Sequence, residues 1–226
     1  MMLHVPEVLD KTQVAECREL LLQAQWQDGK ATAGFQSAMA KDNLQLPEDS
    51  DVARHLSQVV SAAVKRHPLF IAGALPERIF PPLFNCYQGG QSFGLHVDNS
   101  MRMDHSRGEY LRTDLSATLF FNEPGTYEGG ELIVEDTYGA HSVKLPAGDL
   151  ILYPSSSLHR VTPVTQGARL GAFFWIQSMV RDEGQRSLLF DLDTSIQQIH
   201  QQLGADSAAS VQLTGVYHNL LRRWGL

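Results

Sequence analysis

The stretch YQGGQSFGLHVDN, residues 87–99, decides how this chain folds. Glycines such as Gly90 let the backbone turn tightly before an apolar run that ends in His96 and Asp98. Side chains two residues apart point to the same face of a strand, whereas on a helix they diverge. The spacing therefore predicts that His96 and Asp98 share one face of a β-strand while Val97 faces away.

Similar short apolar runs, separated by Gly, Pro, Asn and Asp, continue outward from this stretch between about residues 79 and 180. They are PLFNCY, SFGLHV, DLSATLFFN, GELIVED, HSVKL, DLILYP, LHRVTP and RLGAFFWIQSMV. Eight short strands with turn residues between them predict a double-sheet β-barrel or jelly roll. No helical pattern separates them, which argues against a parallel α/β sheet.

Helical patterns flank this strand-rich region. Asp10 is placed to cap a first helix with Gln13 in a capping box, and Ser50 opens a second, which Pro68 follows. Residues 28–49 between them are expected to be mostly loop. The apolar spacing predicts two further helices at the C-terminus, separated by GADSAAS. The positions that suggest helix are Val14, Cys17, Leu21, Ala24, Val52, Leu56, Val59, Val60, Val64, Leu188, Leu192, Ile196, Ile199, Leu203, Leu213, Tyr217, Leu220 and Trp224.

The composition suits one globular domain with helical additions. The chain has 226 residues, 43% of them hydrophobic, and a net charge of −7, which argues against general nucleic-acid binding. We find no secretory signal at the N-terminus and no apolar run of membrane-spanning length. Cys17 and Cys86 are too few for a disulfide framework or a thiolate zinc site. These observations predict a cytoplasmic protein that binds no membrane.

Two further residues extend the polar set. His159 lies in YPSSSLHRV, several predicted strands after Asp98, and Arg169 follows ten residues later. Two imidazoles and one carboxylate are the ligand set of a non-haem Fe(II) oxygenase, with one face of the metal open. Arg169 could hold the carboxylate of an organic co-substrate. The alternative is that His96 and His159 are hydrogen-bonded core histidines and that Asp98 is a turn residue.

Other candidates carry weaker signals. Asp104 and His105 are a rival ligand pair, but they lie in a polar run where we expect a loop. Trp175 shares the face of Arg169 by strand parity, and it either lines the pocket or fills the barrel. The segment 99–114 is either a mobile lid over the iron or a solvated surface loop.

The chain resembles the Fe(II)/2-oxoglutarate dioxygenases of the prolyl hydroxylase type, and most closely the bacterial PKHD-type hydroxylases. The matching text is YQGGQSFGLHVDN, LSATLFFNEP, YEGGEL, PAGDLILYPSSSLHRVTPVTQGAR and FFWIQS, with RSLLFDLD and the helical tail similar too. The resemblance implies a mainly β fold with flanking helices (α+β), built on a double-stranded β-helix (jelly roll) core. We expect residues 1–77 to be an N-terminal helical region, 78–180 the dioxygenase domain and 181–226 a C-terminal helical extension.

The resemblance also implies roles for individual residues. His96, Asp98 and His159 would ligate Fe(2+), and Arg169 would bind the distal carboxylate of 2-oxoglutarate, with Tyr87 assisting. Related enzymes often carry Ser two residues after the basic residue, where this chain has Gly171, so a neighbour must substitute. The implied reaction uses O2 to couple oxidative decarboxylation of 2-oxoglutarate to hydroxylation, and L-ascorbate is implied as an aid that keeps the iron reduced.

The substrate and the assembly stay open at this point. The target is a prolyl or lysyl residue of a protein, or an iron-related small molecule, and the chain is a monomer or a homodimer. One rival function is a non-enzymatic jelly-roll sensor that binds metal or 2-oxoglutarate. Another is a zinc hydrolase using the same ligand set, although zinc sites need no arginine anchor.

Overall fold

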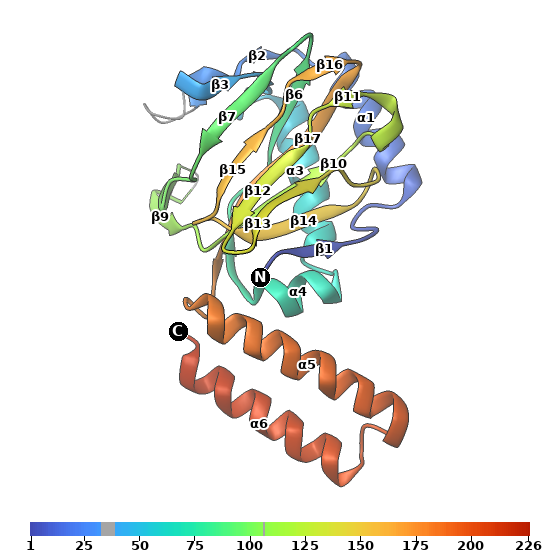
Figure 1. Cartoon of the computed structure of the whole chain (residues 1–226), viewed down its shortest axis with the longest axis vertical. Coiled ribbons are helices and arrows are strands. Elements are labelled where there is room, and N and C mark those ends of the chain that lie inside the picture. Colours follow the sequence, from blue (N-terminus) through green and yellow to red (C-terminus); the bar gives the residue numbers. More distant parts are fainter. Residues whose placement is uncertain (33–38, 106) are drawn as a thin grey trace.

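The computed structural model describes residues 1–32, 39–105 and 107–226, and it places two antiparallel sheets face to face, with helices outside them (Figure 1). The strands are β1 Leu3–Val5, β2 Gln27–Asp28, β3 Lys41–Asp42, β4 Leu44–Gln45, β5 Pro76–Ile79, β6 Leu83–Gln88, β7 Ser92–His96, β8 Met101–Asp104, β9 Glu109–Arg112, β10 Leu115–Phe120, β11 Glu128–Gly129, β12 Leu132–Asp136, β13 Gly139–Val143, β14 Leu150–Pro154, β15 Leu158–Val161, β16 Val164–Gln166 and β17 Ala168–Ser178. The helices are α1 Lys11–Gln23, α3 Asp51–Val64, α4 Pro68–Ala74, α5 Glu183–Leu203 and α6 Ala208–Trp224, and two short 3-10 helices cover Gly29–Thr32 and Pro124–Thr126.

The two sheets divide the strands between a helix-covered layer and an open layer. The larger sheet has the order β1-β14-β10-β17-β6-β4-β2, with β5 also paired to β17, and the smaller has the order β13-β12-β15-β7-β3. Strands adjacent in either sheet pair antiparallel. This is the predicted jelly-roll core with flanking helices, and each of the eight predicted strands is present.

Strand alternation gives the larger sheet two different faces. On β17, Leu170 and Phe174 point outward and pack in one buried cluster with Leu21 of α1 and Leu56 of α3. Arg169 and the other odd-numbered residues of the same strand point toward the smaller sheet. The helices therefore close one side of this sheet, and its other side is left to line a pocket.

The N-terminal helices begin where the capping residues predict. Asp10 accepts a hydrogen bond from the backbone of Gln13, whose side chain accepts one in return, and Ser50 caps α3 in the same position. The prediction missed α4. Pro68 follows the end of α3 as expected, but it is also the first residue of α4, a position where a missing N–H costs nothing.

The segment 99–114 differs from the expectation of a loop. Strands β8 and β9 form an antiparallel hairpin in which Arg102 pairs with Leu111, and Leu111 is buried. These strands were not predicted because one face of the hairpin is exposed to solvent, which makes its sequence polar like that of a loop. Residues 28–49, also expected to be mostly loop, contain the short strands β3 and β4; positions 33–38 of that segment lie outside the described residues.

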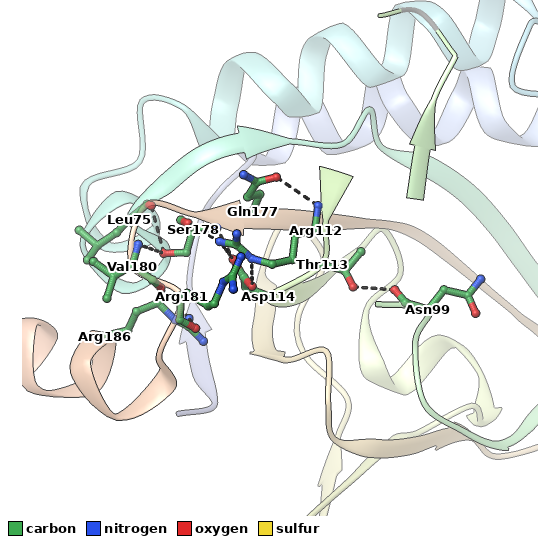
Figure 2. A network of polar contacts seen from close by, with 10 residues as sticks. All are labelled: Leu75, Asn99, Arg112, Thr113, Asp114, Gln177, Ser178, Val180, Arg181 and Arg186. Atoms are coloured by element: carbon green, nitrogen blue, oxygen red, sulfur yellow. Dashed lines mark hydrogen bonds and ion pairs between the residues drawn. The ribbon is translucent and has the colours of Figure 1, made fainter. Parts of the chain in front are cut away.

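The helices α5 and α6 form an antiparallel pair that extends from one end of the sheets (Figure 1). A polar network fixes the base of the pair, as Figure 2 shows. Arg112 makes a two-pronged contact with Asp114 (2.7 and 2.8 Å), Asp114 accepts a hydrogen bond from the backbone of Ser178, and buried Arg186 donates to the carbonyl oxygens of Val180 and Arg181. No helix in the described part of the chain is long and apolar enough to cross a membrane.

Candidate active site

His96 and His159 lie directly opposite each other on the paired strands β7 and β15 of the smaller sheet. Opposed residues on antiparallel strands place their side chains on the same face, and here the ring centroids are 4.2 Å apart. In each residue Nδ1 lies within hydrogen-bond distance of a backbone carbonyl oxygen two residues earlier, Gly94 for His96 and Ser157 for His159. With Nδ1 as the donor, Nε2 of each ring carries its lone pair toward the pocket.

Asp98 completes the group from the segment just after β7. Its Oδ2 lies 3.8 Å from Nε2 of His159 and accepts a hydrogen bond from Ser116 of the facing sheet over 2.6 Å. Ligand atoms of His96, Asp98 and His159 all lie within 4.8 Å of one another, and no other group of at least three His, Cys, Asp or Glu side chains with this geometry occurs among the described residues. The structure thus brings together the three residues that the sequence analysis selected. The rival ligand pair, Asp104 and His105, is not part of this group.

The surroundings of His96 favour an uncharged ring. Burial lowers its pKa to about 4, and the neighbouring His159 acts in the same direction. A metal-ligating imidazole must be unprotonated. His96 is therefore in its metal-binding form near neutral pH, with no proton to displace, and the donor set fits a divalent metal with two nitrogens and one carboxylate.

Arg169 faces the same pocket from the larger sheet. It lies opposite Tyr87 in the pairing of β17 with β6, is 1% exposed, and its guanidinium lies 5.3 Å from the Tyr87 ring and 5.2 Å from the Phe120 ring. No described carboxylate lies within the 4.0 Å of an ion pair, and Nε makes no hydrogen bond within the described structure. A buried cation without a counter-ion is costly, so this position is built for an anionic ligand.

Tyrosine hydroxyls surround that anion position. Burial raises the pKa of Tyr87, although Arg169 opposes the shift, and burial likewise raises the pKa of Tyr127. Both hydroxyls therefore remain protonated and can donate, and Tyr127 lies near enough to Arg169 for the guanidinium to oppose the rise of its pKa. These neutral donors suit a carboxylate held by Arg169.

The neighbour that takes the place of a side chain at position 171 is Asn85. It pairs with Gly171 across β6 and β17, and a Cβ at Gly171 would lie 3.2 Å from its Oδ1 and 3.6 Å from Nη1 of Arg169. Asn85 could not be selected from the sequence, because its role depends on register between strands far apart in the chain.

One pocket of about 800 Å3, which includes its open mouth, joins these groups. Trp175, for which the sequence left both pocket lining and barrel filling as alternatives, lines this pocket. Residues that the sequence analysis did not select line it too. They are Lys41, Asn85, Phe93, Asn99, Arg102, Ser116, Thr118, Tyr153 and Phe173.

Comparison with known families matches two parts of the chain. Residues 82–177 match the 2OG-Fe(II) oxygenase superfamily, and residues 183–225 match the PKHD-type hydroxylase C-terminal domain. A PKHD-type hydroxylase of Burkholderia cenocepacia is 61% identical over 224 residues, and one of Phenylobacterium zucineum is 59% identical over 224 residues, with 99% of each chain covered in both cases.

Solved structures share the fold at low identity. A prolyl hydroxylase from Trichoplax adhaerens, solved with a hypoxia inducible factor peptide, superposes with a TM-score of 0.57 at 16% identity, covering 83% of this chain and 86% of the other. A Pseudomonas putida prolyl-4-hydroxylase gives a TM-score of 0.51 at 20% identity, covering 78% and 92%. These similarities confirm the jelly-roll architecture.

Proposed function

Because this chain belongs to the PKHD-type hydroxylases, a family of 2-oxoglutarate-dependent non-haem iron dioxygenases, we propose that it holds Fe(II) through His96, Asp98 and His159 and hydroxylates a substrate at the expense of 2-oxoglutarate. The observation that carries the proposal is the buried guanidinium of Arg169. It faces the same pocket as the three donor residues and has no carboxylate of the described protein within ion-pair distance.

The two sheets contribute residues with different roles, metal binding on one side and co-substrate binding on the other. His96 and His159 present neutral nitrogens, and Asp98 presents the Oδ1 that Ser116 does not occupy. Arg169 and the Tyr87 hydroxyl bind the distal carboxylate of the co-substrate and so fix its orientation. Iron and 2-oxoglutarate, when bound, supply the oxidising chemistry that converts a C–H bond of the substrate to C–OH and releases succinate and CO2.

The apolar walls keep water away from the reacting groups. Leu132 and Val161 of the smaller sheet and Phe173 of the larger sheet line the pocket. Excluding water strengthens the charge-assisted contacts of Arg169 and protects the reaction from unproductive side routes. The family also supports O2 as the oxidant, and we propose L-ascorbate as the reductant that keeps the iron ferrous.

Other parts of the proposal concern the protein as a whole. We propose that it is cytoplasmic and works as a monomer or homodimer, that it binds no nucleic acid, and that residues 1–77, 78–180 and 181–226 form the three regions defined above. The substrate is a small molecule or a protein residue. A zinc hydrolase is disfavoured because hydrolysis gives no use to a buried Arg169.

The test is anaerobic binding followed by turnover. Metal-free protein given Fe(II) and 2-oxoglutarate should develop a weak visible charge-transfer band, and H159A and D98A should lack it. H141A is the matched control, because His141 is partly exposed and pairs with Asp136 away from the pocket. A protein that hydrolyses esters with zinc and shows no band with iron would contradict the proposal.

A further inference from the structure

The pocket lining contains two cations that the proposed reaction leaves unused, Lys41 and Arg102. Arg102 lies over Trp175, six residues along β17 from Arg169, which is about 20 Å at the rise of an extended strand. Lys41 lies over Phe173, four residues along β17 from Arg169. They are therefore distinct from the anchor for the co-substrate.

Arg102 is held by aromatic rings rather than by a carboxylate. Its guanidinium carbon lies 4.0 Å from the Trp175 ring centroid and 5.2 Å from that of Phe80. No carboxylate among the described residues forms an ion pair with it, and its buried Nε makes no hydrogen bond to any of them. Stacking fixes the plane of the guanidinium, but contributes only part of what a carboxylate would.

Aromatic rings also lie beside Lys41. Its Nζ lies 5.8 Å from the Phe93 ring centroid and 5.7 Å from that of Phe173, it donates to Gln45 over 2.8 Å, and the residue is 5% exposed. Burial lowers its pKa to about 8, and the charge of Arg102 acts in the same direction. The two cations therefore repel each other across the pocket.

This concentration of positive charge stands out in a chain of net charge −7. The carboxylates that act on both cations at longer range are Asp98 and Glu48. Asp98 is committed to the metal in the proposed function, and Glu48 is exposed. An anion between the two cations would relieve their repulsion and satisfy the buried guanidinium edge.

We propose that the hydroxylation substrate carries an anionic oxygen group, a carboxylate or a phosphate, that binds between Lys41 and Arg102 while its reacting carbon extends toward His96, Asp98 and His159. This inference rests on the proposed function. Phe173 and Trp175 form the apolar floor between the cations, and Asn99 adds a polar group to the same lining. Fixing the charged end of the substrate at a distance from the metal would select which carbon reaches it.

The experiment uses the full chain loaded with Mn(II) and 2-oxoglutarate, so that Arg169 is already occupied and no turnover occurs. Inorganic phosphate, N-acetylglutamate and its uncharged diamide, N-acetylglutaminamide, are titrated while tryptophan fluorescence reports on Trp175. We expect one of the two anions to bind, with the amide failing, and R102M and K41M to weaken that binding about tenfold each. Phosphate and N-acetylglutamate together distinguish the two anion types.

The controls separate this inference from the proposed function. R107M removes an exposed arginine from the same hairpin and should bind the anion as the parent does; R102K, which keeps the charge, should recover part of the affinity. Binding that is equal in the parent, R102M and K41M, or equal for anion and amide, would overturn the proposal. So would no binding of either anion, or a loss in R102M of affinity for 2-oxoglutarate, which would assign these cations to the co-substrate. A parent protein that binds no 2-oxoglutarate would instead refute the proposed function.

Discussion

Ser116 donates its hydroxyl hydrogen to Oδ2 of Asp98 over 2.6 Å, and Ser155 in turn lies 2.7 Å from the Ser116 hydroxyl. The contact crosses from the larger sheet to the proposed metal ligand and leaves one carboxylate oxygen for the metal. Groups that orient a ligand contribute substantially to metal affinity. We therefore expect S116A to bind Mn(II) about tenfold to a hundredfold more weakly than the parent.

Calorimetric titration of the metal-free protein measures this effect. S142A is the control, because Ser142 is an exposed residue of β13 that does not line the pocket. Equal affinity in S116A and the parent would show that Asp98 is held by its backbone alone.

Arg169 should affect binding and stability in opposite directions. R169M removes the anchor, so affinity for 2-oxoglutarate in the Mn(II) form should fall about a hundredfold or more. The same change removes a buried charge that has no counter-ion among the described residues, so the metal-free protein should unfold at a higher temperature. Calorimetry and thermal unfolding measure the two effects, and a less stable R169M would contradict this account of the buried charge.

Both cysteines should be unreactive in the folded protein. Burial raises the pKa of Cys17 to about 11, with Glu16 acting in the same direction, and burial raises the pKa of Cys86 to about 11 against the opposing charge of Arg169. At pH 8 only about one thiol in a thousand is then ionised. Labelling with a thiol reagent should be slow in buffer and rapid in denaturant; fast labelling of two thiols in buffer would disprove it.

Asp114 should matter more for stability than an exposed acid does. It is nearly buried and receives hydrogen bonds from Arg112 and the backbone of Ser178 (Figure 2). D114N leaves the Arg112 charge without its partner, so we expect the free energy of unfolding in urea to fall by about 3 kcal/mol. D136N, at an exposed pair with His141, should change it little.

The hairpin of β8 and β9 is our candidate for a lid. It follows Asp98 directly and carries Arg102 against the pocket floor, while Arg107 at its tip is exposed. Trypsin should cut after Arg107 more slowly when Mn(II) and 2-oxoglutarate are bound, because ligands draw the hairpin onto the pocket. Cleavage after Arg66, outside the pocket, is the reference, and an unchanged ratio of the two rates would count against a lid.

Much of the fold was predictable because local signals and packing agree. The capping pairs at Asp10 and Ser50 fixed two helix starts, and alternating apolar runs identified the main strands. Short edge strands such as β3 and the polar hairpin of β8 and β9 escaped prediction. β3 pairs with β7, which is distant in sequence, and the exposed face of the hairpin carries no apolar period.

The candidate site likewise contains residues that could be predicted from the sequence and residues that could not. His96, Asp98, His159 and Arg169 were selected because their residue types and spacing suit metal and carboxylate binding, and the structure places them around one pocket. Ser116 and Asn85 were missed. A serine or an asparagine in a strand is common, and only register across the sheets shows which one faces a ligand.

The opposed placement of the donors and the arginine has a consequence for which organic acids the enzyme accepts. In the proposed function, His96 and His159 hold the metal on one wall of the sandwich and Arg169 anchors the acid on the other, so the distance between the two walls would set the chain length of the acid that can reach both. A four-carbon keto diacid would be too short to reach both the metal and Arg169, and a six-carbon one would have to bend to fit between them. Discrimination among organic acids of different length would then arise from the spacing of the two sheets.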